Sequence, residues 1–335
     1  MKNSVQSISI LGGGSWATAI AKILCENTSA KKINWWVRTP EKADYMRTFH
    51  HNPDYISSVS FVNQPIEFFT NLEDCISEGE IIILAIPSAF VHQTLSGISP
   101  QLYSDKYLIS AVKGLIPETS QILGDYLREH CGINDDHIGV ITGPCHAEEV
   151  ALEKLSFLTL ASKNQNLANE ISKLLQGRFI KTVTSDDIYG TEYAAVLKNI
   201  YAIAAGITHG LGFGDNFLAV LVSNAIRETK RFMAAVHPIE RDIDDSAYLG
   251  DLMVTAYSQF SRNRTFGNML GKGYSVKSAQ IEMKMVAEGY YATKTIYEMN
   301  QKFGVKMPIS DFVYRVIYAN FSAKKAVETL ISQID

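Results

Sequence analysis

One lysine stands alone in a long apolar stretch. Lys198 is the only formally charged residue in residues 193–214, which otherwise have the composition of a buried helix. A buried lysine must find partners or release its proton more easily, and such a lysine can act as a general acid or base. The alternative is a lysine that reaches the surface from a helix edge, but the cost of burying an unpaired charge favours a functional role. We therefore predict acid–base chemistry at Lys198.

Further polar residues follow two predicted strands. Lys113 comes directly after the apolar run 107–112, and the turn Gly143-Pro144-Cys145-His146 follows the run 137–142. Ligands of parallel sheets bind beyond the carboxyl ends of the strands, so we expect Lys113 and this turn in one crevice. Cys145 lacks an evident orienting partner, and we interpret it as a packed cysteine rather than a nucleophile.

A third group of residues suits an anion. Asp251 follows Gly250, and ten residues later comes Ser261-Arg262-Asn263-Arg264. An arginine fork flanked by hydroxyl and amide donors can bind a phosphate. The hydroxyl and amide groups donate hydrogen bonds to the phosphate oxygens that the arginine does not contact. Surface salt bridges are the simpler alternative, and on this cluster alone they are slightly favoured. Glu288, near the next helix, is a weaker signal still.

A glycine-rich loop comes directly after the first predicted strand. Its sequence is Gly12-Gly13-Gly14-Ser15-Trp16-Ala17, and a helix is expected to follow over residues 18–26. A G-x-G-x-x-A pattern between a strand and a helix is a dinucleotide-binding fingerprint. Gly12 permits the turn, Gly14 lets a pyrophosphate approach the backbone, and Ala17 packs the helix on the strand. The amides at the helix start supply donors to the phosphates.

The second strand ends without an acid. Sites that prefer NAD usually carry Asp or Glu there, about 20 residues beyond the loop, to bind the ribose 2′-hydroxyl. Here the residue is Arg38. Arg38 could face a 2′-phosphate, which favours NADP(H) or the use of both cofactors. The alternative is a solvated arginine at a strand end.

These residues need a sheet and helices to position them. Apolar runs alternate with helical segments up to about residue 185, and the segments beginning Thr39-Pro40-Glu41 and Pro117-Glu118 look like helix starts. This predicts an α/β fold, a doubly wound (Rossmann-type), mostly parallel sheet. The expected strands are 5–11, 32–37, 80–86, 107–112, 137–142, 155–161 and 179–184, with a helix at 166–175 before the last.

The pattern changes at about residue 185. Almost everything beyond it has helical periodicity, with expected glycine-rich breaks at 210–214 and 267–273. We therefore predict a dinucleotide-binding domain over residues 1–185 and an all-helical substrate and catalytic domain over 186–335.

Composition narrows the function classes. The 335 residues carry 31 Lys plus Arg against 35 Asp plus Glu, a net charge of −4, so general nucleic-acid binding is not expected. The longest apolar runs fall far short of the roughly 20 residues of a membrane span, so no membrane insertion is expected. Four scattered cysteines and eight histidines show no zinc spacing, which predicts no metal and a reducing, cytoplasmic location.

Several motifs together resemble one family. In order and spacing, the chain resembles bacterial NAD(P)-dependent glycerol-3-phosphate dehydrogenase from Ser9 to about Ala319. The resemblance implies reversible reduction of dihydroxyacetone phosphate to sn-glycerol 3-phosphate for phospholipid synthesis, with NADP(H) or NAD(H) as cofactor and a homodimer as the assembly. The motifs are GGGSWATAIA, AVKGL, GPCHAEE, AVLKNIYAIAAGI, GDLMVT, SRNRTFG and AEGYYATK.

The resemblance also implies residue roles. Lys198 would exchange the proton, Lys113 would hold the substrate oxygen, and Asp251 would orient Lys198 and a substrate hydroxyl. Further substrate contacts would come from Gly143, Cys145, Ser261, Arg262 and Asn263, with Arg262 as the phosphate clamp. Cofactor contacts would come from Gly12, Gly14, Ser15, Trp16, Arg38, Lys113, Ala147, Arg262, Val286 and Glu288.

The chain departs from the family pattern at a few positions. Cys145 stands where Ser or Thr is usual, His146 stands where an aromatic residue is common, and Tyr55-Ile56-Ser57 lacks the usual Leu-Pro. The loss of a hydroxyl at Cys145 affects how tightly that turn binds substrate rather than the reaction class. The alternatives are another two-domain reductase of the ketopantoate or 6-phosphogluconate type, and a nicotinamide-binding sensor without catalysis.

Overall fold

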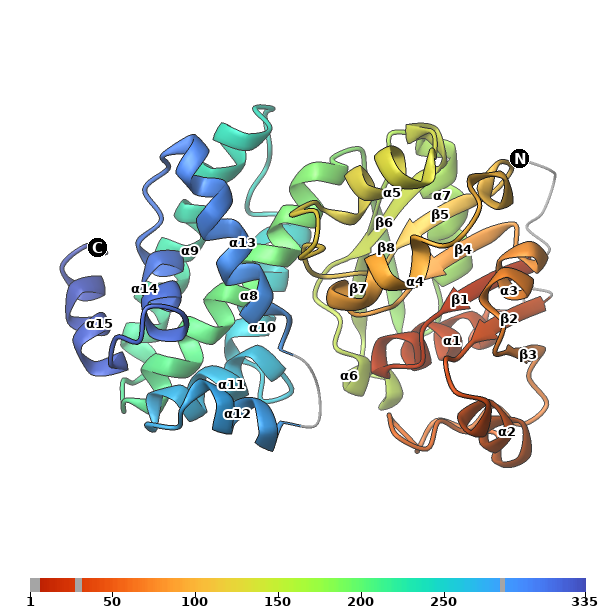
Figure 1. Cartoon of the computed structure of the whole chain (residues 1–335), viewed down its shortest axis with the longest axis horizontal. Coiled ribbons are helices and arrows are strands. Elements are labelled where there is room, and N and C mark those ends of the chain that lie inside the picture. Colours follow the sequence, from red (N-terminus) through yellow and green to blue (C-terminus); the bar gives the residue numbers. More distant parts are fainter. Residues whose placement is uncertain (1–6, 28–31, 284–286) are drawn as a thin grey trace. The chain divides into compact units, whose positions relative to one another are not determined.

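The computed structural model describes residues 7–27, 32–283 and 287–335 (Figure 1). The chain forms two compact units, and each is described by itself. The first contains Met1–Val112 and Leu123–Ile188, and the second contains Lys113–Ile122 and Tyr189–Asp335. Within the described residues, no helix has both the length and the apolar character needed to cross a membrane.

The first unit is built on one eight-stranded sheet. Its strand order is β3-β2-β1-β4-β5-β6-β7-β8, and every neighbouring pair is parallel except β6 and β7. This order contains the 3-2-1-4-5-6 order of a doubly wound nucleotide-binding sheet, so the predicted fold class is confirmed. The strands are β1 Ser7–Leu11, β2 Lys32–Trp36, β3 Ile66–Phe69, β4 Ile81–Leu84, β5 Tyr107–Ser110, β6 Ile138–Thr142, β7 Ser156–Ala161 and β8 Ile180–Ser185.

Among these strands, only β3 was not predicted from the sequence. β3 lies at the edge of the sheet and pairs with β2 alone, and only Phe68 of its four residues is buried. The central strands β4 and β6, in contrast, are buried at every position. A short, half-exposed edge strand therefore lacks the continuous apolar run by which the others were recognised.

Helices and short turns connect the strands. Helix α1 packs beside α6 and α7. The helices of this unit are α1 Ser15–Glu26, α2 Pro40–Phe49, α3 Leu72–Glu78, α4 Val91–Leu95, α5 Leu123–Cys131, α6 Ala147–Ala151 and α7 Gln165–Leu175, with single 3₁₀ turns at Ser88–Phe90, Pro100–Tyr103 and Asp135–His137.

Two of the expected helix starts were wrong. Helix α1 begins at Ser15 rather than at residue 18, because Gly14 is extended and the helix follows it at once. Helix α5 begins at Leu123 rather than near Pro117. A bridge between Ile116 and Gln121, with Ser120 at a φ of 58°, closes a turn over that segment instead.

The second unit is helical, as predicted. Apart from the bridge between Ile116 and Gln121, its described residues contain no strand pairing. Its helices are α8 Ile188–Gly210, which starts at the last residue of the first unit, α9 Asp215–Val236, the π-helical turn Ser246–Gly250, α10 Asp251–Tyr257, α11 Arg262–Gly271, α12 Val276–Glu282, α13 Glu288–Phe303, α14 Pro308–Ile317 and α15 Ala323–Ile331.

The glycines of this unit have two different roles. The expected break at residues 210–214 separates α8 from α9. The break expected at 267–273 begins later than predicted, because α11 continues through Gly267 to Gly271 and α12 then begins at Val276. A Cβ on Gly267 would lie 2.1 Å from the carbonyl oxygen of Ile203, and one on Gly206 would lie 2.1 Å from that of Arg264. These glycines therefore let the backbones of α8 and α11 touch, which offsets their low helix propensity.

Candidate functional site

The glycine-rich loop has the geometry of a phosphate-binding turn. Gly12 has a φ of +130°, and a Cβ there would lie 2.4 Å from the carbonyl oxygen of Ala85, so only glycine fits. A Cβ on Gly14 would meet no protein atom within 4 Å, which leaves the approach to this backbone open. Ala17 is fully buried where α1 packs on the sheet. The three small residues thus fit the roles expected of a dinucleotide loop.

The start of α1 keeps its positive end uncompensated. Its first turn contains no acidic residue, and no side chain caps it. The backbone N–H groups and the helix dipole therefore favour an anion at this point. Ser15 is buried at the first helical position and Trp16 is half-buried beside it.

A pocket of about 320 Å³ lies against this loop. It is bounded by the glycines, the end of β2, the first turn of α2 and residues that follow β4. Arg38 is exposed and lines the pocket. Lys42, Asp54 and Tyr55 line it as well, and the sequence analysis did not assign them a role.

The turn after β6 also depends on a glycine. Gly143 has a φ of +110°, and a Cβ there would lie 2.9 Å from the carbonyl oxygen of Phe157 in β7. Cys145 is buried and forms no disulfide, and Ala147 is buried at the start of α6. All of these residues belong to the first unit.

The predicted acid–base residues meet in the second unit. The Lys198 ammonium in α8 donates to Asp251 Oδ1 at 2.5 Å, and Lys113 Nζ lies 3.8 Å from Asp251 Oδ2. Lys198 is 6% exposed and Asp251 is 1% exposed. One buried carboxylate is therefore shared by two lysines. Lys113 lies beyond the end of β5 at Ser110, and it groups with the helices rather than with the sheet.

The charge balance of this cluster sets the acidity of Lys198. Burial lowers the pKa of Lys198 to about 7, and the positive charge of Lys113 acts in the same direction, while Asp251 opposes both by favouring the charged form. A lysine that titrates near neutral pH can both give and accept a proton under physiological conditions. Lys198 is thus buried as expected, and Asp251 is its counter-ion.

A series of hydrogen bonds between amide groups holds the segments around this cluster together. Asn199 Nδ2 donates to the backbone carbonyl of Lys113 at 2.7 Å, and Asn263 Nδ2 donates to Asn199 Oδ1 at 2.9 Å. The backbone N–H of Gly289 then donates to Asn263 Oδ1 at 2.9 Å. Three segments are thereby tied to α8 next to Lys198. The sequence alone gave no role to Asn199, because nothing in the local pattern reveals a bond to residue 113.

The expected anion-binding residues begin α11. The Ser261 hydroxyl accepts from the backbone N–H of Arg264 and caps the helix, and Arg262 is the first helical residue and is half-buried. Ser261 and Asn263 therefore already make contacts within the protein. A serine that accepts a hydrogen bond can still donate its hydroxyl proton, and an asparagine amide that donates one proton can still donate its second. Glu288 begins α13 and is half-buried, whereas Val286 lies outside the described residues.

The predicted residues thus form two sets, one inside each unit. The first unit contains a nucleotide-type loop with a cationic pocket, and the second contains a buried lysine–aspartate pair with a second lysine beside it. Such a pair can transfer a proton and stabilise developing negative charge on an oxygen. Among the described residues, no group of three or more His, Cys, Asp or Glu side chains could hold a metal ion.

Comparison with known proteins matches both halves of the chain to one family. Residues 7–168 match the family model described as NAD-dependent glycerol-3-phosphate dehydrogenase N-terminus, and residues 187–328 match the corresponding C-terminus model. The glycerol-3-phosphate dehydrogenase [NAD(P)+] of Clostridium botulinum, strain Eklund 17B, is 35% identical over 327 residues, which cover 98% of this chain and 97% of the relative.

Two further proteins extend the similarity. The enzyme of the same name from Bacillus subtilis is 32% identical over 331 residues, covering 98% of this chain and 95% of the relative. The crystal structure of glycerol-3-phosphate dehydrogenase from Coxiella burnetii superposes with a TM-score of 0.91 at 29% identity, over 98% of this chain and 99% of that one. The similarity therefore spans both units and includes the fold.

Proposed function

Because the chain belongs to the NAD-dependent glycerol-3-phosphate dehydrogenase family, we propose that it catalyses the reversible, NAD(P)H-dependent reduction of dihydroxyacetone phosphate to sn-glycerol 3-phosphate. The observation that carries this proposal is the buried Lys198–Asp251 pair with Lys113 beside it. The product would supply the glycerol backbone of phospholipids.

Lys198 is the proton donor in reduction and the proton acceptor in oxidation. The bound nicotinamide supplies or removes a hydride. When the substrate carbonyl becomes a hydroxyl, its oxygen gains a proton from the Lys198 ammonium, which is left as a neutral amine and regains a proton from solvent. The pKa of Lys198, lowered to about 7 mainly by burial, makes both directions accessible near neutral pH.

Cationic residues bind the substrate and its developing charge. Lys113 holds the reacting oxygen and stabilises negative charge on it, and Asp251 orients Lys198 and a substrate hydroxyl. Arg262 binds the substrate phosphate, which provides binding energy remote from the reacting carbon. The remaining substrate contacts are Gly143, Cys145, Ser261 and Asn263.

The glycine-rich loop and its pocket hold the cofactor. The open approach to the backbone of Gly14 and the uncapped start of α1 suit a pyrophosphate, and exposed Arg38 suits a 2′-phosphate. The full set of residues proposed to contact NADP(H) or NAD(H) is Gly12, Gly14, Ser15, Trp16, Arg38, Lys113, Ala147, Arg262, Val286 and Glu288.

We further propose that the two parts of the chain have different roles. Residues 1–185 act as the dinucleotide-binding domain, and residues 186–335 act as the helical substrate and catalytic domain.

The expected assembly is a homodimer through the helical domain, where Met253, Tyr257 and Phe260 are apolar and exposed. Light scattering of the purified chain tests this, and a monomer would contradict it. The four cysteines lie in the described residues and none forms a disulfide, which suits a cytoplasmic location.

The reaction is tested by following NADPH, and separately NADH, when the purified chain meets dihydroxyacetone phosphate. Dihydroxyacetone is the matched control because it lacks only the phosphate. We expect oxidation that depends on the phosphate. Equal oxidation with both ketones would favour a reductase for another substrate, and cofactor binding without oxidation would favour a non-catalytic sensor.

A further inference from the structure

The pocket beside the glycine-rich loop contains an acid that the sequence did not reveal. No acid stands at the end of β2, but Asp54, from the segment between α2 and β3, lines the same pocket as Arg38. Lys42, in the first turn of α2, is the other charged residue of the lining. The described lining therefore carries two cations and one carboxylate, close to the expected position of a ribose.

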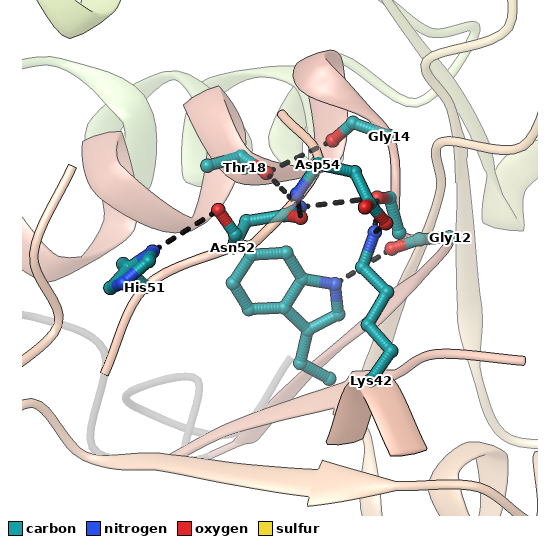
Figure 2. Close-up of polar contacts among 9 residues, drawn as sticks. Gly12, Gly14, Thr18, Lys42, His51, Asn52 and Asp54 are labelled. Carbon is teal, nitrogen blue, oxygen red and sulfur yellow. Dashed lines mark hydrogen bonds and ion pairs between the residues drawn. The ribbon is translucent and has the colours of Figure 1, made fainter. Parts of the chain in front are cut away.

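Lys42 is held between the glycine-rich loop and Asp54 (Figure 2). Its ammonium donates to the backbone carbonyl of Gly13 at 2.8 Å and to Asp54 Oδ2 at 3.0 Å, and it lies 4.7 Å from the centre of the Tyr55 ring. The Lys42 side chain is 13% exposed, whereas that of Asp54 is 61% exposed. The cation is thus fixed at the loop, while the carboxylate stays accessible to a ligand.

The segment that carries Asp54 is itself anchored to the loop. Asn52 is fully buried and donates through Nδ2 to the Gly13 carbonyl at 3.1 Å and to Thr18 Oγ1 at 2.8 Å. Its Oδ1 accepts from the backbone N–H of Asp54 at 3.1 Å (Figure 2). Asp54 is therefore placed by the same contacts that hold the glycine-rich loop, and its position does not depend on Lys42 alone.

We propose that Lys42 and Asp54 form a selectivity pair for the ribose 2′ position of the adenine dinucleotide. Lys42 adds a second cation to Arg38 for the 2′-phosphate of NADP(H). Asp54 accepts a hydrogen bond from the 2′-hydroxyl of NAD(H), which is the role usually filled by an acid at the end of β2. Because one carboxylate can accept several hydrogen bonds, Asp54 can restrain Lys42 and bind the hydroxyl together.

Lys42 and Asp54 affect the binding of NADP(H) and NAD(H) in opposite ways. A 2′-phosphate next to Asp54 meets a like charge, and a 2′-hydroxyl gains little from a second cation. Asp54 therefore limits the preference for NADP(H) that Arg38 and Lys42 would otherwise give, and the chain accepts both cofactors. This inference rests on the proposed function, because it concerns the same dinucleotide pocket.

Fluorescence titration of the purified full-length chain with NADPH and with NADH tests the pair. Adenosine 2′,5′-bisphosphate and AMP, used as competitors, report the 2′ position without any turnover. We expect Lys42→Met to weaken NADPH and the bisphosphate by about tenfold, a typical loss for one charge-assisted contact, and to change NADH and AMP by less than about twofold. Asp54→Asn should tighten NADPH and weaken NADH.

Two further variants separate selectivity from structure. Lys42→Arg keeps the charge and should retain the wild-type ratio of the two affinities. Lys173→Met removes the same charge from α7, where the side chain is 70% exposed and pairs with Glu170, and it should leave the ratio unchanged. If Lys42→Met does not fold, Asp54→Asn still tests the pair, because it leaves the contact between Lys42 and Gly13 in place.

The outcomes distinguish this inference from the proposed function. Equal weakening of both dinucleotides by Lys42→Met would show that Lys42 only supports the loop, and an unchanged ratio in Asp54→Asn would remove the role of the acid. Either result overturns the selectivity pair while leaving the reaction intact. A wild-type chain that binds neither dinucleotide would overturn the proposed function itself, and this inference with it.

Discussion

Asp251 and Lys113 should shift the pH dependence of reduction in opposite directions. Ketone reduction needs Lys198 protonated, so kcat/KM should be high at acidic pH and fall as the pH rises through the pKa of Lys198, about 7 in the wild type. Asp251 raises this pKa and Lys113 lowers it. Asp251→Asn should therefore move the alkaline limb to lower pH, and Lys113→Met should move it to higher pH.

The size of each shift follows from the geometry. Asp251 Oδ1 contacts the Lys198 ammonium at 2.5 Å in a buried setting, and an opposite charge this close typically shifts a pKa by about 1 to 3 units. Lys113 Nζ lies farther away, 3.8 Å from the other carboxylate oxygen, and its side chain is 19% exposed, so solvent screens its charge more. We expect its removal to raise the pKa of Lys198 by about 1 unit at most.

The assay is the initial rate of NADPH oxidation at low concentrations of dihydroxyacetone phosphate across the range of pH in which the chain is folded. The substrate phosphate titrates in the same range, with a pKa of about 6 for a phosphate monoester. Its contribution cancels when each variant is divided by the wild type at each pH. The quantity to compare is the pH at which the alkaline limb of kcat/KM falls, because both variants also lower the maximal rate.

Lys173→Met is the matched control, since it removes an exposed lysine that pairs with Glu170 on α7. Its limb should coincide with that of the wild type. If the alkaline limb stays in place in both Asp251→Asn and Lys113→Met, or moves in the same direction in both, the electrostatic explanation of the Lys198 pKa is refuted.

Four more predictions follow from the structure. Lys198→Ala should lower turnover by about 10² to 10⁴-fold with nearly unchanged cofactor affinity, measured by steady-state kinetics and titration. Arg38→Ala should raise the KM for NADPH more than that for NADH, and equal effects would remove the 2′-phosphate argument. Gly206→Ala, whose Cβ would lie 2.1 Å from the Arg264 carbonyl, should reduce the free energy of unfolding by about 1 to 3 kcal/mol or more in denaturant titrations. Burial raises the pKa of Glu228 to about 7, so its contribution to stability is full below about pH 4.5 and is lost progressively as the pH rises from there through 7; Glu228→Gln should remove that decline between about pH 4.5 and pH 7.

The sheet could be predicted because its inner strands are apolar on both faces. All residues of β4 and β6 are buried, so both strands form continuous apolar runs in the sequence. The glycine-rich loop could be recognised because its strand and helix context is local. The half-exposed edge strand β3 could not, because its four residues lack such a run. Gly267 was taken for a break because a glycine needed for close packing looks like a glycine that ends a helix.

The acid–base site could be predicted only in part. The lone charge of Lys198 in an apolar helix indicates burial, but Asp251 is 53 positions away, and only the family resemblance linked the two. The contact of Asn199 with Lys113 spans 86 positions. Lys42 and Asp54 are likewise joined by tertiary structure, across the end of α2. Local periodicity indicates which residues are buried and carries no information on which distant residues they meet.

Product analysis shows directly whether the chain reduces dihydroxyacetone phosphate and whether Lys198 is required. The purified chain is incubated with NADPH and dihydroxyacetone phosphate, and the phosphorylated product is identified by phosphorus NMR and a stereospecific assay. We expect one sn-glycerol 3-phosphate for each NADPH oxidised, with formation slowed by orders of magnitude in Lys198→Ala. NADPH oxidation without this product, or equal rates in the wild type and the variant, would contradict it.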